Sequence, residues 1–90
     1  MKSREAVDPE LHVLRTIGRA LDGRERQELE SARFHLYAAF EASDADSARR
    51  WAIATRAVLL ALRKTTGGEE AALMKLGLEV LETIEQAIAP

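Results

Sequence analysis

Apolar residues recur along the chain at intervals of three and four, the spacing that places side chains on one face of an α-helix. This pattern predicts helices over residues 9–22, 24–42, 47–64 and 69–89. In chain order, the predicted buried faces consist of Leu11, Leu14, Ile17 and Leu21; Leu29, Ala32, Leu36, Ala39 and Phe40; Trp51, Thr55, Val58 and Leu62; and Leu73, Leu76, Val80, Ile84, Ala87 and Ile88. Each helix therefore needs a neighbour to cover its apolar side.

Short polar or glycine-containing segments separate these helices. Asp8-Pro9-Glu10 supplies a capping side chain, a proline at the first helical position and an acid in the first turn. Gly23 is a left-handed stop for the first helix, residues 43–46 favour a turn and a helix cap, and residues 65–68 end the third helix. Short loops between amphipathic helices predict an all-α fold, a small antiparallel bundle of about four helices. An open three-helix core with a peripheral first helix is the alternative.

The segment EASDADSARRWA at residues 41–52 resembles the turn between the two helices of a tetratricopeptide repeat. Ser43 stands where that turn usually has glycine, and the segment does not recur at the period of about 34 residues that such repeats have. The resemblance implies a helical hairpin at this point of the chain and nothing about function.

Two glycines, Gly18 and Gly77, lie toward the apolar faces of their helices, where glycine costs ~1 kcal/mol relative to alanine. We interpret both as positions where two helices cross closely, rather than as flexible hinges.

Composition limits the chain to one small domain and removes several kinds of chemistry. Ninety residues, 47% of them hydrophobic, can bury a modest core but no deep internal cavity. We expect residues 1–8 to be a flexible N-terminal segment and residues 9–90 to form a single helical domain. The absence of cysteine excludes disulfides, a thiol nucleophile and a thiolate metal site. No apolar run approaches the ~20 residues of a membrane-spanning helix, and no apolar stretch follows the charged start, so we expect a cytoplasmic protein without a membrane partner.

Motifs for catalysis or cofactor binding are missing. His12 and His35 fall on the polar sides of different helices, and neither follows a glutamate at the spacing of a helical metal site. No serine lies in a nucleophile elbow. Gly67-Gly68 precedes a helix start, but the two glutamates that follow would repel a phosphate. We therefore expect no enzyme, no catalytic residue, no cofactor and no metal.

Charge is distributed unevenly over the last two helices. Over residues 47–64 the third helix carries five basic residues and no acid, a charge of +5, whereas the fourth carries five glutamates against Lys75, which is −5 + 1 = −4. Basic residues at the end of the third helix suit the helix dipole, but Arg49 and Arg50 near its start do not. These two arginines therefore call for another explanation.

Two helices carry apolar residues outside their predicted core faces. On the third helix, five residues form a stripe, here called the arginine–aliphatic row: Arg49, Ile53, Arg56, Leu60 and Arg63. On the second helix, Phe34 and Tyr37 share a side that is distinct from the core face. A helix that is apolar on two sides either lies centrally in a bundle or offers one side to a partner.

These surfaces predict a non-catalytic protein–protein interaction module, either self-associating, as in a homodimer, or acting as a small regulatory or accessory subunit. The arginine–aliphatic row, Phe34 and Tyr37 are the predicted partner-binding residues, and another copy of the chain is the expected partner. One alternative is a nucleic-acid-binding protein that uses the basic face of the third helix, although the net charge of −2 disfavours it. In the other alternative, both extra apolar sides are filled within the monomer: the first helix covers Phe34 and Tyr37, and Ile53 and Leu60 are ordinary scattered surface residues.

Overall fold

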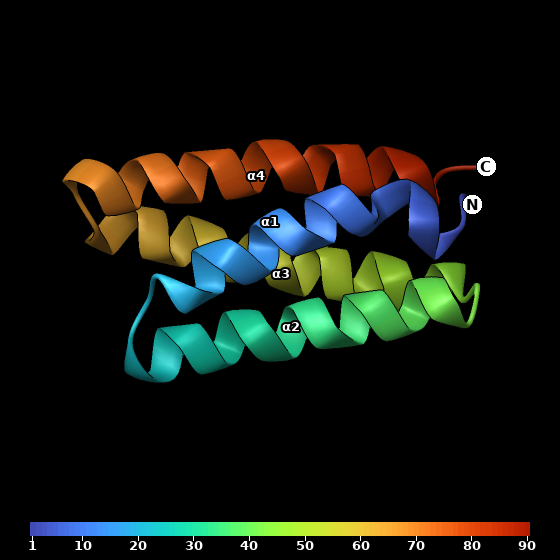
Figure 1. The fold of residues 1–90 in the computed structure, drawn as a ribbon, viewed down its shortest axis with the longest axis horizontal. Helices are drawn as coiled ribbons and strands as arrows, with labels where there is room; N and C mark the ends of the chain where they lie inside the picture. Colours follow the sequence, from blue (N-terminus) through green and yellow to red (C-terminus); the bar gives the residue numbers. More distant parts are fainter.

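Four helices form an antiparallel bundle in the computed structural model, which describes all residues from 1 to 90 (Figure 1). They are α1 (Asp8–Arg19), α2 (Gly23–Glu41), α3 (Ala45–Thr65) and α4 (Gly68–Ile88), and the short 3₁₀ helix η1 (Arg4–Val7) precedes them. Both α1 and α3 pack against α2 and α4, and α1 crosses obliquely over the other helices. The predicted fold class and the predicted number of helices are confirmed.

The first helix is shorter than predicted. It ends at Arg19, whereas the other helix boundaries lie within two residues of the predicted ones. Leu21 is nevertheless buried and belongs to the core cluster. Gly23 has the predicted left-handed backbone (φ 60°), but it stands at the entry to α2 and does not terminate α1.

The core is formed by apolar residues from all four helices. Every residue predicted for the buried faces of α1 and α2 is buried. Leu14 and Ile17 of α1 are almost completely enclosed, so α1 belongs to the core and the open three-helix alternative is wrong. Thr55, a buried polar residue, donates its hydroxyl hydrogen bond to the Trp51 carbonyl oxygen over 2.7 Å. The buried hydroxyl group of Thr55 thus has a hydrogen-bond partner within its own helix.

The buried faces of α3 and α4 differ in part from the predicted ones. On α3, Leu59 is fully buried, whereas Trp51 and Val58 are only half-buried. On α4, Leu76 is exposed, and Met74 and Leu81 are fully buried instead; Leu73 and Val80 are only half-buried. Both helices carry aliphatic residues on several sides, so more than one face satisfies a helical period. The small side chains of α3 that face inward, Ala48 and Ala52, allow its neighbours to approach.

The two glycines differ in their surroundings. A Cβ atom added to Gly77 would lie 3.1 Å and 3.3 Å from the side chains of Leu59 and Ile17, which confirms a close approach at this position. At Gly18 the nearest atoms would be 3.7 Å away, an ordinary contact distance. Close crossing therefore explains Gly77, and the interpretation of Gly18 was wrong because a methyl group fits there.

The start of the chain packs against the bundle. Val7 is buried in the core, and the Lys2 backbone N–H donates to the Ala87 carbonyl oxygen over 2.8 Å. The two termini thus lie side by side (Figure 1). For residues 1–8 the sequence predicted a flexible segment; the structure gives part of it a defined place through η1, which the helical pattern does not indicate.

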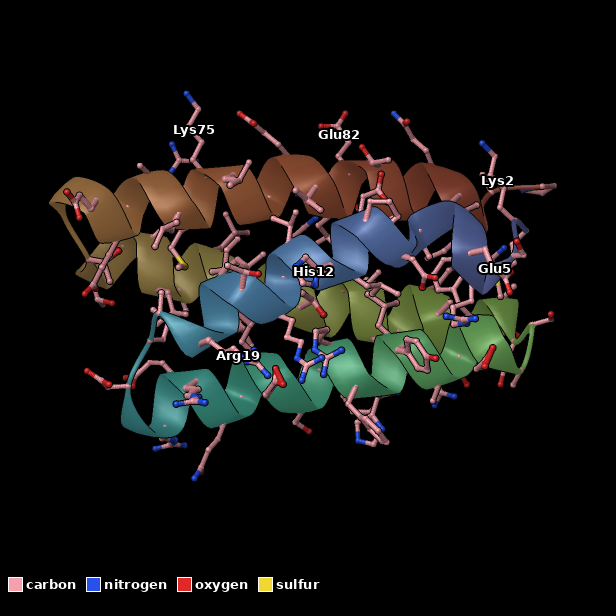
Figure 2. The ribbon with its side chains drawn as sticks, in the orientation of Figure 1. Lys2, Glu5, His12, Arg19, Lys75 and Glu82 are labelled. Atoms are coloured by element: carbon pink, nitrogen blue, oxygen red, sulfur yellow. The ribbon has the colours of Figure 1, made fainter.

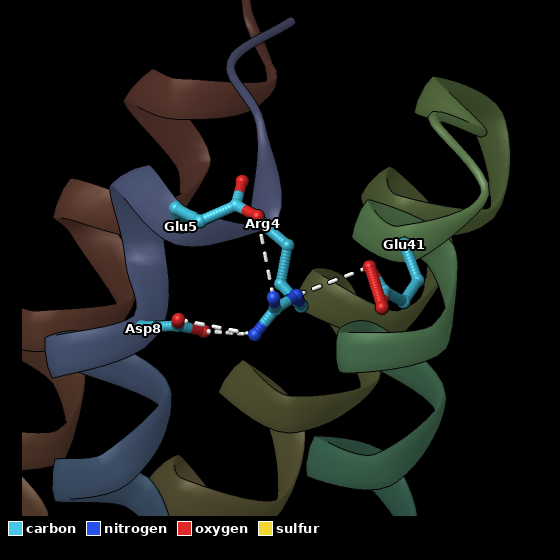
Figure 3. A network of polar contacts seen from close by, with 4 residues as sticks. All are labelled: Arg4, Glu5, Asp8 and Glu41. Carbon is cyan, nitrogen blue, oxygen red and sulfur yellow. Dashed lines mark hydrogen bonds and ion pairs between the residues drawn. The ribbon is translucent and has the colours of Figure 1, made fainter.

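Arg4 joins η1 to α1 and α2 (Figure 3). Its guanidinium donates to Glu41 over 3.0 Å, to Asp8 over 3.1 Å and to Glu5 over 3.3 Å, and it lies 5.2 Å from the centre of the Tyr37 ring. Partial desolvation opposes the charged form, but the surrounding carboxylates outweigh it and raise the pKa of Arg4. One side chain thereby covers Tyr37 and closes the gap between α1 and α2.

The turn between α2 and α3 satisfies its backbone groups locally. Ser43 adopts a left-handed conformation (φ 53°) at the position where the resembling turn has glycine, and the backbone N–H groups of Ser43 and Asp44 donate to the carbonyls of Phe40 and Ala39. Asp44 caps α3 by accepting hydrogen bonds from the hydroxyl and the backbone N–H of Ser47 over 2.7 and 3.1 Å. These hydrogen bonds lower the pKa of Asp44.

Candidate interaction surface

The arginine–aliphatic row lies along the side of α3 that borders α4. Its apolar members are exposed: 65% of the Ile53 surface and 41% of the Leu60 surface are accessible to solvent. Arg49 and Arg63 are exposed as well, and Arg56 is half-buried. The predicted row is therefore a continuous surface, and no other helix of the bundle covers its two aliphatic side chains.

Asp46 changes the charge balance predicted for α3. The helix begins at Ala45 rather than at residue 47, so it includes Asp46 and carries +5 − 1 = +4. The Asp46 carboxylate accepts a hydrogen bond from Arg49 over 3.1 Å. An acid in the first turn also offsets the unfavourable position of the two arginines near the start of the helix. The expectation of a third helix without acids was wrong because the helix starts two residues earlier.

Arg56 is paired within the chain. Its guanidinium donates a hydrogen bond to the Glu85 carboxylate of α4. This hydrogen bond, together with the charges of Glu85 and then Glu82, outweighs partial desolvation and raises the pKa of Arg56. The pair places the middle of the arginine–aliphatic row against one side of α4.

The adjoining side of α4 carries a net charge of −1, from two glutamates and one lysine. Lys75, Leu78, Glu82 and Glu85 share this side at intervals of three and four residues. Figure 2 shows Lys75 and Glu82 projecting outward from the bundle. We call the arginine–aliphatic row and these four residues together the α3–α4 face. It presents a basic and aliphatic strip beside an acidic one.

A groove opens at one end of the α3–α4 face, beside the chain terminus. It has a volume of about 370 Å³ and is lined mostly by apolar residues. The lining residues are Arg49, Ala52, Ile53, Glu85, Ile88, Ala89 and Pro90. Ile53 and the last residues of the chain therefore form an apolar recess with a charged residue from each helix at its rim.

The second predicted surface, Phe34 with Tyr37, does not form one patch. Tyr37 is half-buried against the core beneath Arg4, so the monomer fills that side of α2. Phe34 is 59% exposed, and its ring meets His35 edge to face at 5.8 Å between centroids. Neither residue adjoins the α3–α4 face.

The sequence did not predict an aromatic cluster that lies between α2 and α3. His35 is exposed, as predicted, but its ring stacks on Trp51 with 4.1 Å between centroids and 24° between planes. Trp51 therefore lies at the surface between the two helices and not in the core. A contact between residues on two helices depends on how the helices pack, and the period of one helix does not reveal it.

No set of three or more His, Cys, Asp or Glu side chains is arranged to hold a metal ion. The longest helices contain too many charged residues to span a bilayer. Comparisons with protein-family models, with curated proteins and with solved structures find no match to this chain. Function has to be inferred from the surface residues themselves, above all from those of the α3–α4 face.

Proposed function

We propose that this protein is a non-catalytic helical module that binds another protein through its α3–α4 face. The observation that carries the proposal is the exposure of Ile53 between two arginines and beside an apolar groove. An isolated exposed aliphatic residue is common, but here Leu60 repeats the exposure two turns further along the same side. The bundle gains nothing from leaving both side chains in water.

The chemistry of the face suits a protein partner. Protein interfaces combine apolar residues at the centre with arginine and a polar rim. Arg49 and Arg63 flank the aliphatic residues, and their methylene groups can add to the apolar contact while the guanidinium groups bind carboxylates. A small module of this kind can act as an accessory subunit or as a self-associating unit.

Nucleic acid is a poorer fit for the same face. Two arginines of the row, Arg49 and Arg56, already pair with carboxylates of the chain. The acidic strip of α4 would lie close to any phosphate backbone placed on α3, and repulsion between the two would weaken binding. These contacts favour a partner that offers both basic and acidic groups.

A photocrosslinking experiment tests the proposal. A photoreactive amino acid replaces Ile53 in one variant and Thr16, an exposed residue of α1, in the control variant. In cells that produce the protein, we expect light to link position 53 to a defined protein, which mass spectrometry can identify, and position 16 to link far less. Crosslinking to nucleic acid, or equal and diffuse products from both positions, would contradict the proposal.

A further inference from the structure

We infer that the partner on the α3–α4 face is a second copy of this chain, related by a two-fold axis that runs parallel to α3 and α4. The inference rests on the proposed function, because it names the occupant of the same surface. It follows from the charges of the two helices, from the geometry of two-fold symmetry and from the size of the face.

Charge makes the face complementary to itself. On this face the arginine–aliphatic row carries three arginines, a charge of +3, whereas the α4 strip carries Glu82 and Glu85 against Lys75, which is −2 + 1 = −1; the two helices lie side by side. A two-fold interface uses the same patch on both copies, so the patch must complement itself. A surface of one charge would repel its copy, whereas a basic strip beside an acidic strip can satisfy this condition.

Symmetry then allows only one favourable arrangement of two such faces. A two-fold axis across the helices would place α3 on α3 and α4 on α4, and both contacts would join like charges. An axis along the helices places α3 of each copy on α4 of the other, and both contacts join opposite charges. The uneven charge distribution therefore selects the axis parallel to the helices.

The same geometry fixes which residues meet. A two-fold axis along the helices does not shift residues along their length. Each residue of α3 therefore faces, on α4 of the partner subunit, the same position that it already borders on α4 of its own chain. Because Arg56 and Glu85 are level with each other, Arg56 approaches Glu85 of the partner subunit as well. Ile53, which shares a groove with Ala89, comes to lie over the same end of the partner subunit. The apolar recess at the chain terminus is thereby covered.

The size of the face agrees with a dimer that uses its whole length. The molecule measures 36 × 20 × 18 Å, so an interface that buries the standard ~800 Å² on each partner needs most of the length of one side. The groove end by itself is too small to form an interface of this size. The interface therefore extends from Arg49 to Arg63 along α3.

Charge reversal tests the arrangement. One variant carries Arg49→Glu and Arg63→Glu, which reverses two charges of the arginine–aliphatic row; the other carries Glu82→Lys, which changes the charge of the α4 strip from −1 to +1. Neither changes the Arg56–Glu85 pair. Arg15→Glu with Arg19→Glu, on exposed positions of α1, is a control with the same change in net charge as the first variant. Light scattering on a sizing column gives the molar mass of each, and circular dichroism verifies that each is helical.

We expect the wild-type chain and the α1 control to reach twice the 10.0 kDa chain mass as concentration rises. Each α3 or α4 variant alone stays at the chain mass, and an equimolar mixture of the two returns to twice that mass, because both contacts again join opposite charges. A monomeric wild type, or a mixture that stays monomeric, overturns the inference. In that event a defined protein crosslink at position 53 would leave the proposed function standing, whereas the loss of both results would reject both.

Discussion

Arg56 of α3 and Glu85 of α4 form the one ion pair that directly joins two of the four long helices. Both side chains remain about one-third exposed, so solvent screens their attraction. The pair therefore adds little to the stability of the bundle. In the proposed dimer, its position in the middle of the α3–α4 face also makes it a contact between copies.

Replacing Glu85 by Gln separates these two roles. Within one chain, loss of a partly exposed ion pair should lower the free energy of unfolding by only about 0.2–1 kcal/mol. Urea unfolding at low protein concentration measures this cost. Association should weaken more clearly, because the substitution removes one carboxylate from each of two symmetric contacts. A large loss of stability with unchanged association would contradict this division.

Gly18 and Gly77 form a matched pair for helix packing. Gly18→Ala should stabilise the protein by up to about 1 kcal/mol, because alanine favours the helix and the added methyl group makes only ordinary contacts. Gly77→Ala should destabilise it by about 1 kcal/mol, because Leu59 and Ile17 are buried and cannot move away easily. Urea unfolding of both variants measures the two changes. Stabilisation by both substitutions would mean that the crossing at Gly77 is looser than the structure shows.

Leu59 and Trp51 test which side of α3 faces the core. Leu59→Ala should cost about 3 kcal/mol, the value typical of a fully buried leucine. Trp51→Ala should cost less, about 2 kcal/mol, because the ring is half-buried and stacks on His35 at the surface. Urea denaturation gives both values, provided that the slope of the unfolding free energy against urea concentration stays that of the wild type. If Trp51→Ala proved the more damaging, the predicted buried face of α3 would be correct and the observed one wrong.

Asp44 should make stability depend on pH. Its pKa in the folded protein lies below its ordinary value of 3.8 because Ser47 donates two hydrogen bonds to the carboxylate. The ionised cap therefore stabilises the fold above pH 3.8, and this stabilisation is lost as the pH falls through the lowered pKa. Asp44→Ala should lower the melting temperature by roughly 4–8 °C at neutral pH and by progressively less in acid.

Asp22 provides the control for this experiment. It occupies the same position before α2 as Asp44 does before α3, but its side chain makes no capping hydrogen bond. Asp22→Ala should therefore change the melting temperature little at either pH. Equal effects of the two substitutions would show that charge near the helix start matters and that the hydrogen bonds to Ser47 do not.

The sequence predicted the parts of this fold that depend on neighbours along the chain. The faces of α1 and α2 were predicted correctly because the leucine and isoleucine residues of each helix all share one side. On α3 the choice between Trp51 and Leu59 failed, since aliphatic residues on several sides satisfy the same period. The Arg4–Tyr37 and His35–Trp51 contacts join separate helices, so they depend on packing angles that no local pattern contains.

The candidate site followed the same division. The arginine–aliphatic row could be predicted because its five residues share one side of one helix. The α4 strip beside it could not be positioned without the Arg56–Glu85 contact, and the groove depends on how Ile88 and Ala89 lie beside Ile53. Phe34 and Tyr37 seemed equivalent in the sequence only because the cover that Arg4 provides for Tyr37 comes from a distant segment.

The molar mass of the wild-type chain and of the double variant Ile53→Asp with Leu60→Asp tests the central claim most directly. Light scattering over a series of concentrations should show the wild type rising from 10.0 kDa toward twice that mass. The double variant should remain at 10.0 kDa with unchanged helical content, because both side chains are exposed in the monomer. A wild type that stays monomeric at every concentration, or a double variant that still dimerises or that unfolds, would contradict pairing through the α3–α4 face.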